Sequence, residues 1–510
     1  MRFTALLTAM TAVATSVVSA APATGAAAAC SDLLASLPKS VLIQTSPTYT
    51  PAQNGGFNPL NNKLSPSCIV QPTSASDVAT AMRAVFKHKA NYAVRSGGHT
   101  GMGGWDSTDG GVLLDFSLMR DFSYSSSAGT VTVGPGLRWG EVYNMSEAYG
   151  VAPLGGRVYH VGTGLVLGGG LSLLSPQYGY ACDGLVSADI VTVDGRIRTV
   201  NAQTDPQLLR AIKGGGGRFG VVTKYELRAF PTGRNSDKNW YGGSITVLTP
   251  TGIDQMVEYS EDFVATPDDP KATLLSNVGM LKQAGVPVYL GTTFAFYKGG
   301  AEDFNRVFGQ FLAIPGAIVD VKPISYLEAT QVTPLGWKPT QAYKWIGGSH
   351  YAGNNTTPLP LLPTIPVLNE PTPTKFLGIW RNVQALIVKH VDVLESAFFS
   401  ITPVGTTQID QGYAAGGNAI APPQGRNFMH YLFSNILADG TTDFPADFEA
   451  DRQQFIKDNP SDAGLPLFLN EVDATQEAFK SYGWYDQLKR QYKRFDPTGF
   501  SLRFQQGPTF

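Results

Sequence analysis

The first half of the chain alternates short apolar runs with polar turns. A helix is predicted to begin at Ser74 or Ser76, because apolar residues from Val78 to Phe86 recur at helical spacing. A second helix is predicted for residues 139–149, and strands for residues 91–95, 111–118, 129–133 and 185–193. The last of these runs ends in Asp194-Gly195, a dipeptide typical of a tight turn after a strand. This half is therefore predicted to mix short strands and helices.

The pattern changes near Pro231, where longer helical runs begin to alternate with strand-like runs. Helices are predicted for residues 252–264, 301–311 and 377–399, with a Pro-rich connector at 358–374. A final helix at 484–494 is ended by Asp496-Pro497. We find no internal repeats, and we expect a second domain after Pro231.

The first twenty residues have the pattern of a secretory signal peptide. Arg2 supplies a positive start, residues 5–18 form a short apolar to neutral core, and Val18-Ser19-Ala20 is a small-x-small cleavage site. The apolar run is shorter than the ~20 residues that span a bilayer, and no later run of that length lacks charge, Gly or Pro. We expect a secreted protein without a membrane anchor.

Charge and composition narrow the class further. The 510 residues carry 38 Lys+Arg and 40 Asp+Glu, a formal net charge of −2, and only 15% of residues are charged. A protein that follows nucleic-acid phosphates would be far more basic, so we expect no nucleic-acid partner. At 43% apolar residues the chain can bury large cores.

The three cysteines suit an oxidising compartment. A bridge between Cys30 and Cys68 would tie the N-terminal arm to the first domain, whereas Cys182 lies in an apolar context typical of a buried thiol. No His or Cys spacing suggests a metal site. Asn144, Asn354 and Asn355 lie in permitted glycosylation sequons.

Glycine clusters are the most informative feature. They occur at 97–98, 162–170 and 214–217, with a further pair at 155–156. Glycine at strand-to-helix turns lets backbone N–H groups approach a phosphate closely, so several clusters in a weakly charged chain indicate a large anionic cofactor. No cluster has the Rossmann or P-loop pattern.

An ordered set of motifs resembles the berberine-bridge-enzyme-like oxidases of the vanillyl-alcohol-oxidase superfamily of FAD proteins. The matches cover nearly the whole mature chain and are Arg95-Ser96-Gly97-Gly98-His99 with Gly101, the segments 132–136, 161–170, 178–183, 185–191 and 214–222, and the C-terminal segments 470–473 and 492–497. The resemblance implies an α+β fold of two domains, with an FAD-binding domain and a substrate domain whose antiparallel sheet is covered by helices. We place a signal peptide at 1–20, an N-terminal arm at 21–61, the FAD domain at 62–231, the substrate domain at 232–465 and a C-terminal segment returning to the FAD domain at 466–510.

By the same resemblance, His99 is covalently bonded to the flavin 8-methyl group. Many relatives carry a second tether through a cysteine, but that position is Val158 here and Cys182 lies too far along, so we expect a single link. His160, beside this loop, is a further candidate for flavin or substrate contact, or a histidine satisfied by packing. The residues expected to bind FAD are Arg95, Ser96, Gly97, Gly98, His99, Thr100, Gly101, Val161, Gly162, Thr163, Gly168, Gly169, Gly170, Tyr178, Asp183, Ile190, Phe219, Gly220 and Val221.

Two further positions are informative when the chain is set beside this family. Val161 matches the position associated with oxygen access, where a small side chain favours an oxidase. Arg218 stands where relatives commonly carry Asn, and it either pairs with a phosphate or is exposed.

The resemblance offers two candidates for the catalytic base that removes a hydroxyl proton during hydride transfer to the flavin. These are Glu471 and His430, with Tyr431 orienting the base. A capping or hydrogen-bonding role beside Asp473 is the structural alternative for Glu471.

The sequence motifs do not decide between several substrate classes. An alcohol-type small molecule, an oligosaccharide and a secondary metabolite undergoing oxidative cyclisation all suit the flavin, with dioxygen as acceptor and hydrogen peroxide as product. A binding protein that has lost its chemistry is the non-enzymatic alternative. We expect a monomer, and the aromatic residues that either stack on substrate or belong to the core are Trp240, Trp337, Trp345 and Tyr351.

Overall fold

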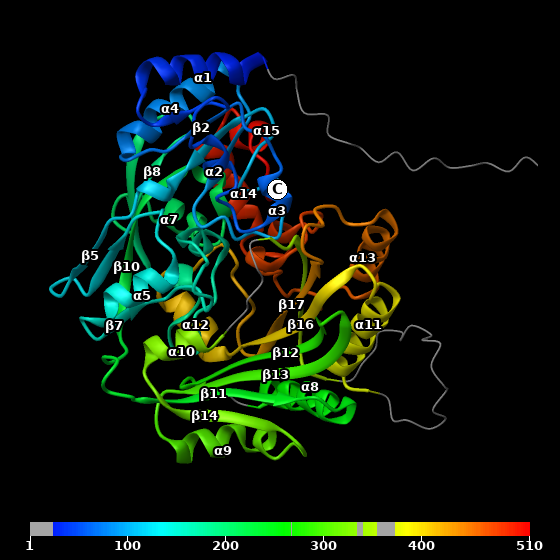
Figure 1. The fold of residues 1–510 in the computed structure, drawn as a ribbon. Helices are drawn as coiled ribbons and strands as arrows, with labels where there is room; N and C mark the ends of the chain where they lie inside the picture. Colours follow the sequence, from blue (N-terminus) through cyan, green and yellow to red (C-terminus); the bar gives the residue numbers. More distant parts are fainter. Residues whose placement is uncertain (1–23, 267, 334–339, 354–372) are drawn as a thin grey trace, which may run out of the picture.

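The computed structural model describes residues 24–266, 268–333, 340–353 and 373–510, and it combines helices with three sheets (Figure 1). Two smaller sheets belong to the N-terminal part of the chain, drawn blue to cyan-green, and the third to the part that follows. The red C-terminal helices return to the N-terminal part. This is the α+β fold that the motifs imply.

The N-terminal sheets are short-stranded. The first has the order β1-β2-β4-β3, with β1 Val41–Leu42 antiparallel to β2 Cys68–Val70, and with β2 and β3 Tyr92–Arg95 both parallel to β4 Val112–Asp115. The second is antiparallel and contains β5 Phe122–Ser125, β6 Thr130–Val133, β7 Val151–Pro153, β8 Leu185–Val191, β9 Ile197–Asn201 and β10 Val221–Pro231. The loops that leave β3 and β7 carry the glycine clusters at 97–98, 155–156 and 162–170, and the cluster at 214–217 lies between α7 Pro206–Ile212 and β10.

The third sheet is antiparallel throughout, in the order β14-β11-β13-β12-β16-β17-β15. Its strands are β11 Trp240–Val247, β12 Ala272–Gln283, β13 Val286–Tyr297, β14 Ile318–Ile324, β15 Tyr343–His350, β16 Leu394–Val404 and β17 Phe428–Leu437. Helices α8 Pro250–Ala265, α9 Ala301–Leu312 and α11 Lys375–Lys389 bury apolar residues against one face (Figure 1). The other face is left for the site.

The remaining helices connect the sheets or cover them. They are α1 Thr24–Ser36, α2 Tyr49–Gln53, α3 Pro59–Asn62, α4 Ala75–His88, α5 Trp139–Glu147, α6 Ser175–Tyr178, α7 Pro206–Ile212, α10 Tyr326–Val332, α12 Thr406–Ala414, α13 Ala446–Asp458, α14 Tyr485–Phe495 and α15 Phe500–Phe504. The start predicted for α4 is confirmed, because Ser74 caps the helix and forms a capping box with Asp77. At the C-terminus, Phe500 packs on Phe86 and Tyr92 of the N-terminal part.

One predicted helix is wrong in its second half. The helix predicted over 377–399 ends at Lys389, and β16 begins at Leu394. The segment 394–401 alternates sides in a sheet and pairs with both β12 and β17, so tertiary pairing overrides the helical spacing.

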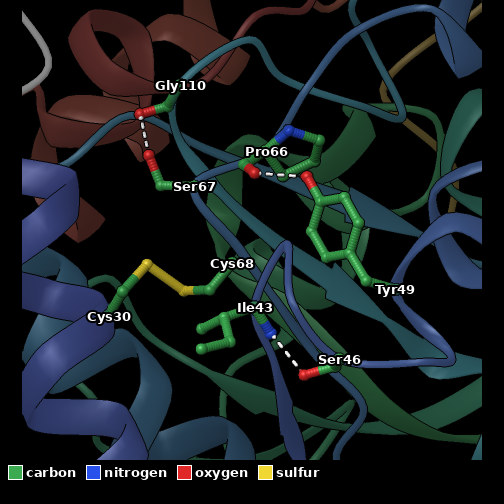
Figure 2. The surroundings of a disulfide bond; sticks show 8 residues. All are labelled: Cys30, Ile43, Ser46, Tyr49, Pro66, Ser67, Cys68 and Gly110. Atoms are coloured by element: carbon green, nitrogen blue, oxygen red, sulfur yellow. Dashed lines mark hydrogen bonds between the residues drawn. A yellow bond between two sulfur atoms is a disulfide. The ribbon is translucent and has the colours of Figure 1, made fainter.

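The predicted disulfide between Cys30 and Cys68 is present and joins α1 to β2 (Figure 2). Around it, Tyr49 donates a hydrogen bond to the Pro66 carbonyl and Ser67 to the Gly110 carbonyl (Figure 2). Cys182 is free and buried, as expected. Within the described ranges, no helix has the length and apolar character needed to cross a membrane.

Candidate active site

A cavity of about 310 Å³ lies where the N-terminal loops, the inner face of the third sheet and the C-terminal segment meet. The two sides of its wall are built from different groups. The N-terminal side is mostly backbone of glycine loops, whereas the sheet side is made of side chains. The lining residues used below are Ser96, Gly97, Gly98, His99, Thr100, Asp106, Arg157, Val158, Val161, Gly162, Gly168, Gly220, Val221, Leu275, Asn277, Trp345, Ser400, Leu432, Phe468 and Glu471.

The glycine side is built by two loops whose backbones touch. A Cβ on Gly97 would come within 2.5 Å of the Gly162 nitrogen, so neither position admits a side chain. The Ser96 and Thr163 hydroxyls both donate to the Pro135 carbonyl, at 2.6 and 3.1 Å, and fix the loops in place. The contact leaves a wall of closely spaced backbone groups.

This wall fits the phosphates of a dinucleotide. Among the described lining residues, acidic or basic side chains come only from His99, Asp106, Arg157 and Glu471. An anionic group would therefore be held largely by backbone N–H groups rather than by a cluster of cations. Ser96, Gly97, Gly98 and Gly162 are the residues that would hold it.

His99 lies in this wall as an imidazole without charge. Its Nδ1 atom is buried, and its ring stacks on Phe57 with centroids 4.3 Å apart. Burial lowers the pKa of His99 to about 3, so the ring is neutral at physiological pH. A neutral imidazole nitrogen has the lone pair that bond formation to carbon requires.

Asp106 is a second ionisable group on this side. It is 7% exposed, and neither carboxylate oxygen accepts a hydrogen bond from another residue of the described chain. Burial raises its pKa to about 6, against the opposing effect of the Arg95 charge. Nothing in the sequence had singled out this residue.

Glu471 is the acidic group at the sheet end. It follows Asn470, whose side chain accepts a hydrogen bond from Gly170 N at 3.1 Å and donates one to the Leu165 carbonyl at 3.1 Å. Asn470 thereby attaches the C-terminal segment to the glycine loop. Two residues after Glu471, Asp473 accepts hydrogen bonds from Arg452 and from the Thr475 amide.

Arg157 faces Glu471 across the cavity wall, with Nη2 3.7 Å from Oε1. Burial raises the pKa of Glu471, and the positive charge of Arg157 opposes that rise. The guanidinium also donates to the Thr402 hydroxyl at 3.0 Å. The pair gives the cavity a base whose charge is balanced by a buried cation.

The structure does not bring His430 and Tyr431 to the cavity. Nε2 of His430 bonds to the Tyr180 hydroxyl at 2.9 Å and Nδ1 to the Ser349 hydroxyl at 2.8 Å, and burial lowers its pKa to about 3. Tyr431 faces the other side of the sheet, because consecutive strand residues alternate, and it packs on His350 and Phe399. The prediction that Tyr431 orients a base is therefore wrong.

The predicted FAD-binding residues divide into a wall and its supports. Those that line the cavity are Ser96, Gly97, Gly98, His99, Thr100, Val161, Gly162, Gly168, Gly220 and Val221. Those that lie outside the lining are Arg95, Gly101, Thr163, Gly169, Gly170, Tyr178, Asp183, Ile190 and Phe219. Arg95, for example, is buried in an ion pair with Asp115 at 3.0 Å, and Asp183 accepts from Tyr180 N and Asn418.

The structure also places Arg218 and His160. Arg218 is neither exposed nor in the cavity wall, since it donates to the carbonyls of Ser501, Gln505 and Pro508. His160 is exposed and lies outside the lining.

Of the four aromatic candidates, Trp345 lines the cavity, whereas Trp240 is buried elsewhere. Tyr351 lies outside the lining under the Arg426 guanidinium. Trp337, like the sequons Asn354 and Asn355, lies outside the described residues.

Comparisons with known proteins agree with this geometry. Residues 66–201 match the model of the FAD binding domain family. An FAD-dependent monooxygenase of Arthrobotrys oligospora is 29% identical over 450 residues, which cover 85% of this chain and 80% of that relative.

Two solved structures share the fold over nearly the whole chain. Berberine bridge enzyme from Eschscholzia californica superposes with a TM-score of 0.74 at 18% identity, covering 94% of this chain and 99% of that one. A carbohydrate oxidase from Microdochium nivale gives 0.72 at 20% identity over 94% and 99% of the two chains.

Proposed function

This chain belongs to the berberine-bridge-enzyme-like FAD-linked oxidoreductases, and we propose that it is an oxidase of alcohol-type substrates with FAD tethered through His99. The proposal rests on one observation: the same cavity is lined by a neutral His99 on the glycine side and by Glu471 on the sheet side. When bound, the flavin accepts a hydride from the substrate carbon and passes the electrons to dioxygen, which gives hydrogen peroxide.

Glu471 acts as the base in this proposal. It accepts the hydroxyl proton while the adjacent C–H bond breaks, and a carboxylate needs its ionised form to do so. Arg157 favours that form by opposing the effect of burial, which raises the pKa of Glu471. Such a positioned base contributes about 10²–10⁴-fold to the rate.

His99 and Val161 serve the cofactor. The His99 imidazole would hold the flavin through its 8-methyl group, with dioxygen as the two-electron oxidant for that bond. Val158 stands in the cavity wall where relatives carry a second tethering cysteine, so a single link is proposed. Val161, a small apolar side chain in the wall, leaves dioxygen a path to the reduced ring.

Secretion completes the proposal. It is supported by the signal-peptide pattern of residues 1–20 and by the disulfide between Cys30 and Cys68. Asn144, the one sequon within the described residues, is exposed and open to a glycan. N-terminal sequencing of protein from the culture medium, expected to begin at Ala21, tests the cleavage.

The similarity to a protein named as a monooxygenase makes oxygen insertion the second candidate. The two differ in where the oxygen atoms go. An oxidase releases one hydrogen peroxide per product and needs no added reductant, whereas a monooxygenase places one atom of labelled dioxygen in the product. Turnover of an alcohol panel under ¹⁸O₂, with peroxide measured in parallel, decides between them. Label in the product without peroxide would overturn the proposal.

A further inference from the structure

The inner face of the third sheet places a polar pair, Asn277 and Ser400, in the cavity wall. Asn277 of β12 pairs in register with Ser400 of β16, which pairs with Leu432 of β17. All three line the cavity, so they share the inner face. No motif in the sequence had drawn attention to Asn277 or Ser400.

Asn277 presents an unused donor at this wall. It is 4% exposed, and its Oδ1 accepts a hydrogen bond of 2.6 Å from the Ser400 hydroxyl. Its Nδ2 is buried and donates to no residue of the described chain. A buried amide donor without an acceptor costs about 1–3 kcal/mol, so a ligand oxygen or water is expected to accept from it.

Arg157 provides a second donor at the same end. The guanidinium is 8% exposed and uses Nη1 on the Thr402 hydroxyl. Its contact with Glu471 is 3.7 Å, longer than a hydrogen bond, so the Nη2 protons are not taken up by that carboxylate. Donors and a base therefore stand together around one region of the cavity.

The rest of this end is apolar. Leu171, Leu275, Leu432 and Phe468 line it, with Trp345 further along. A sugar has a hydroxyl on nearly every carbon, and each one buried here without a partner is unfavourable. An apolar ring system with one oxygen matches the wall.

We propose that Asn277 and Arg157 form an oxygen-binding subsite that selects an alcohol on an apolar, ring-bearing body over an oligosaccharide. Both donate to the substrate oxygen while Glu471 takes its proton. FAD, when bound, would supply the hydride acceptor for the same carbon, so that the held oxygen would become a carbonyl. Ser400 is a positioning residue, because its hydroxyl occupies Oδ1 and leaves Nδ2 for the substrate. This subsite rests on the proposed function.

The test compares two probes of the same shape. 2-Naphthol carries one oxygen but has no carbinol hydrogen to lose, and 2-methylnaphthalene lacks the oxygen. Dissociation constants are measured on the purified protein by flavin difference spectra and by quenching of tryptophan fluorescence. In Asn277→Leu, binding of 2-naphthol is expected to weaken about 10–100-fold, whereas binding of 2-methylnaphthalene changes less than twofold.

Two further variants keep the test decisive. Ser400→Ala frees the amide to rotate and is expected to weaken 2-naphthol binding by a smaller factor, even if Asn277→Leu does not fold. Tyr431→Phe is the matched control, since that hydroxyl lies on the other face of the same sheet, where the ring packs on His350 and Phe399 outside the cavity lining. Cellobiose is expected to give no saturable signal.

Equal binding of both probes in wild type, unchanged 2-naphthol affinity in both Asn277→Leu and Ser400→Ala, or cellobiose binding more tightly than 2-naphthol would each overturn the subsite. Failure of the proposed function looks different. It gives no peroxide from any alcohol, while fluorescence still reports whether 2-naphthol affinity depends on Asn277.

Discussion

The two ends of the cavity are built by different means. On the glycine side, the backbones of two loops meet at Gly97 and Gly162, and bulk there is excluded. On the sheet side, Arg157, Asn277 and Glu471 reach the cavity from three distant segments. Backbone N–H groups would bind the phosphates that all dinucleotides carry, whereas the side chains at the sheet side would select the molecule that is oxidised. The cofactor end is therefore expected to respond to added bulk and the substrate end to changed polar groups.

The largest expected effect lies at the substrate end. Glu471→Gln keeps the shape but removes the proton acceptor, so kcat is expected to fall about 10²–10⁴-fold. The flavin absorption spectrum is expected to stay unchanged. Tyr431→Phe is the control, because that hydroxyl lies on the helix-covered face and its loss leaves kcat within twofold. Steady-state peroxide assays measure both; a Glu471→Gln variant of wild-type rate would remove this residue as the base.

Asp106 tests whether the cofactor end tolerates a buried charge. Its folded pKa of about 6 lies above the ordinary 3.8, so the folded state binds the proton more tightly and its stability is lost as pH rises from about 4 through 6. Asp106→Asn has no such loss. The difference in free energy of unfolding between this variant and wild type is therefore expected to shift by about 3 kcal/mol in favour of the variant between pH 3.5 and pH 7. Urea unfolding at both pH values measures the difference. An equal difference in free energy of unfolding between variant and wild type at the two pH values would contradict the burial of the Asp106 carboxyl.

Added bulk is the sharper test of the glycine side. In Gly97→Ala, the new methyl would meet the Gly162 backbone, which is expected to destabilise the protein by about 1–3 kcal/mol and to lower its flavin content. Gly103→Ala is the matched control, because a Cβ there meets no atom within 4 Å. Thermal unfolding and the ratio of flavin to protein absorbance read the two effects. Equal behaviour of the two variants would mean that the loops do not meet as described.

The smallest expected effect concerns dioxygen. Val161→Leu narrows the apolar wall, so reoxidation of the reduced flavin by air is expected to slow about tenfold, equivalent to ~1.4 kcal/mol. Anaerobic reduction by substrate is expected to change less than twofold. Stopped-flow absorbance follows each half-reaction separately, and equal slowing of both would discard the role of Val161 in oxygen access.

The cofactor end was largely predictable from the sequence because its requirements are local. A loop that must approach a phosphate needs glycine at fixed positions. Gly97 and Gly98 directly precede His99, and Gly162 belongs to a glycine cluster of its own. The disulfide was predictable because the chain has few cysteines, and the start of α4 because capping serines lie just before its apolar helical pattern.

The substrate end was not predictable, because its residues converge only through the sheet. Asn277 and Ser400 are neighbours across strands that are 123 residues apart in sequence. His430 and Tyr431 were treated as a pair, although consecutive residues of a strand face opposite sides. Arg218 finds its acceptors some 290 residues away at the C-terminus, a contact without any local pattern.

The most direct test of the account is the visible spectrum of the purified protein before and after acid precipitation, with His99→Ala alongside. We predict flavin bands that stay with the precipitate in wild type and move to the supernatant in His99→Ala. A colourless wild-type protein, wild-type flavin released to the supernatant, or flavin retained in the His99→Ala precipitate would contradict the tethered cofactor on which the comparison of the two ends depends.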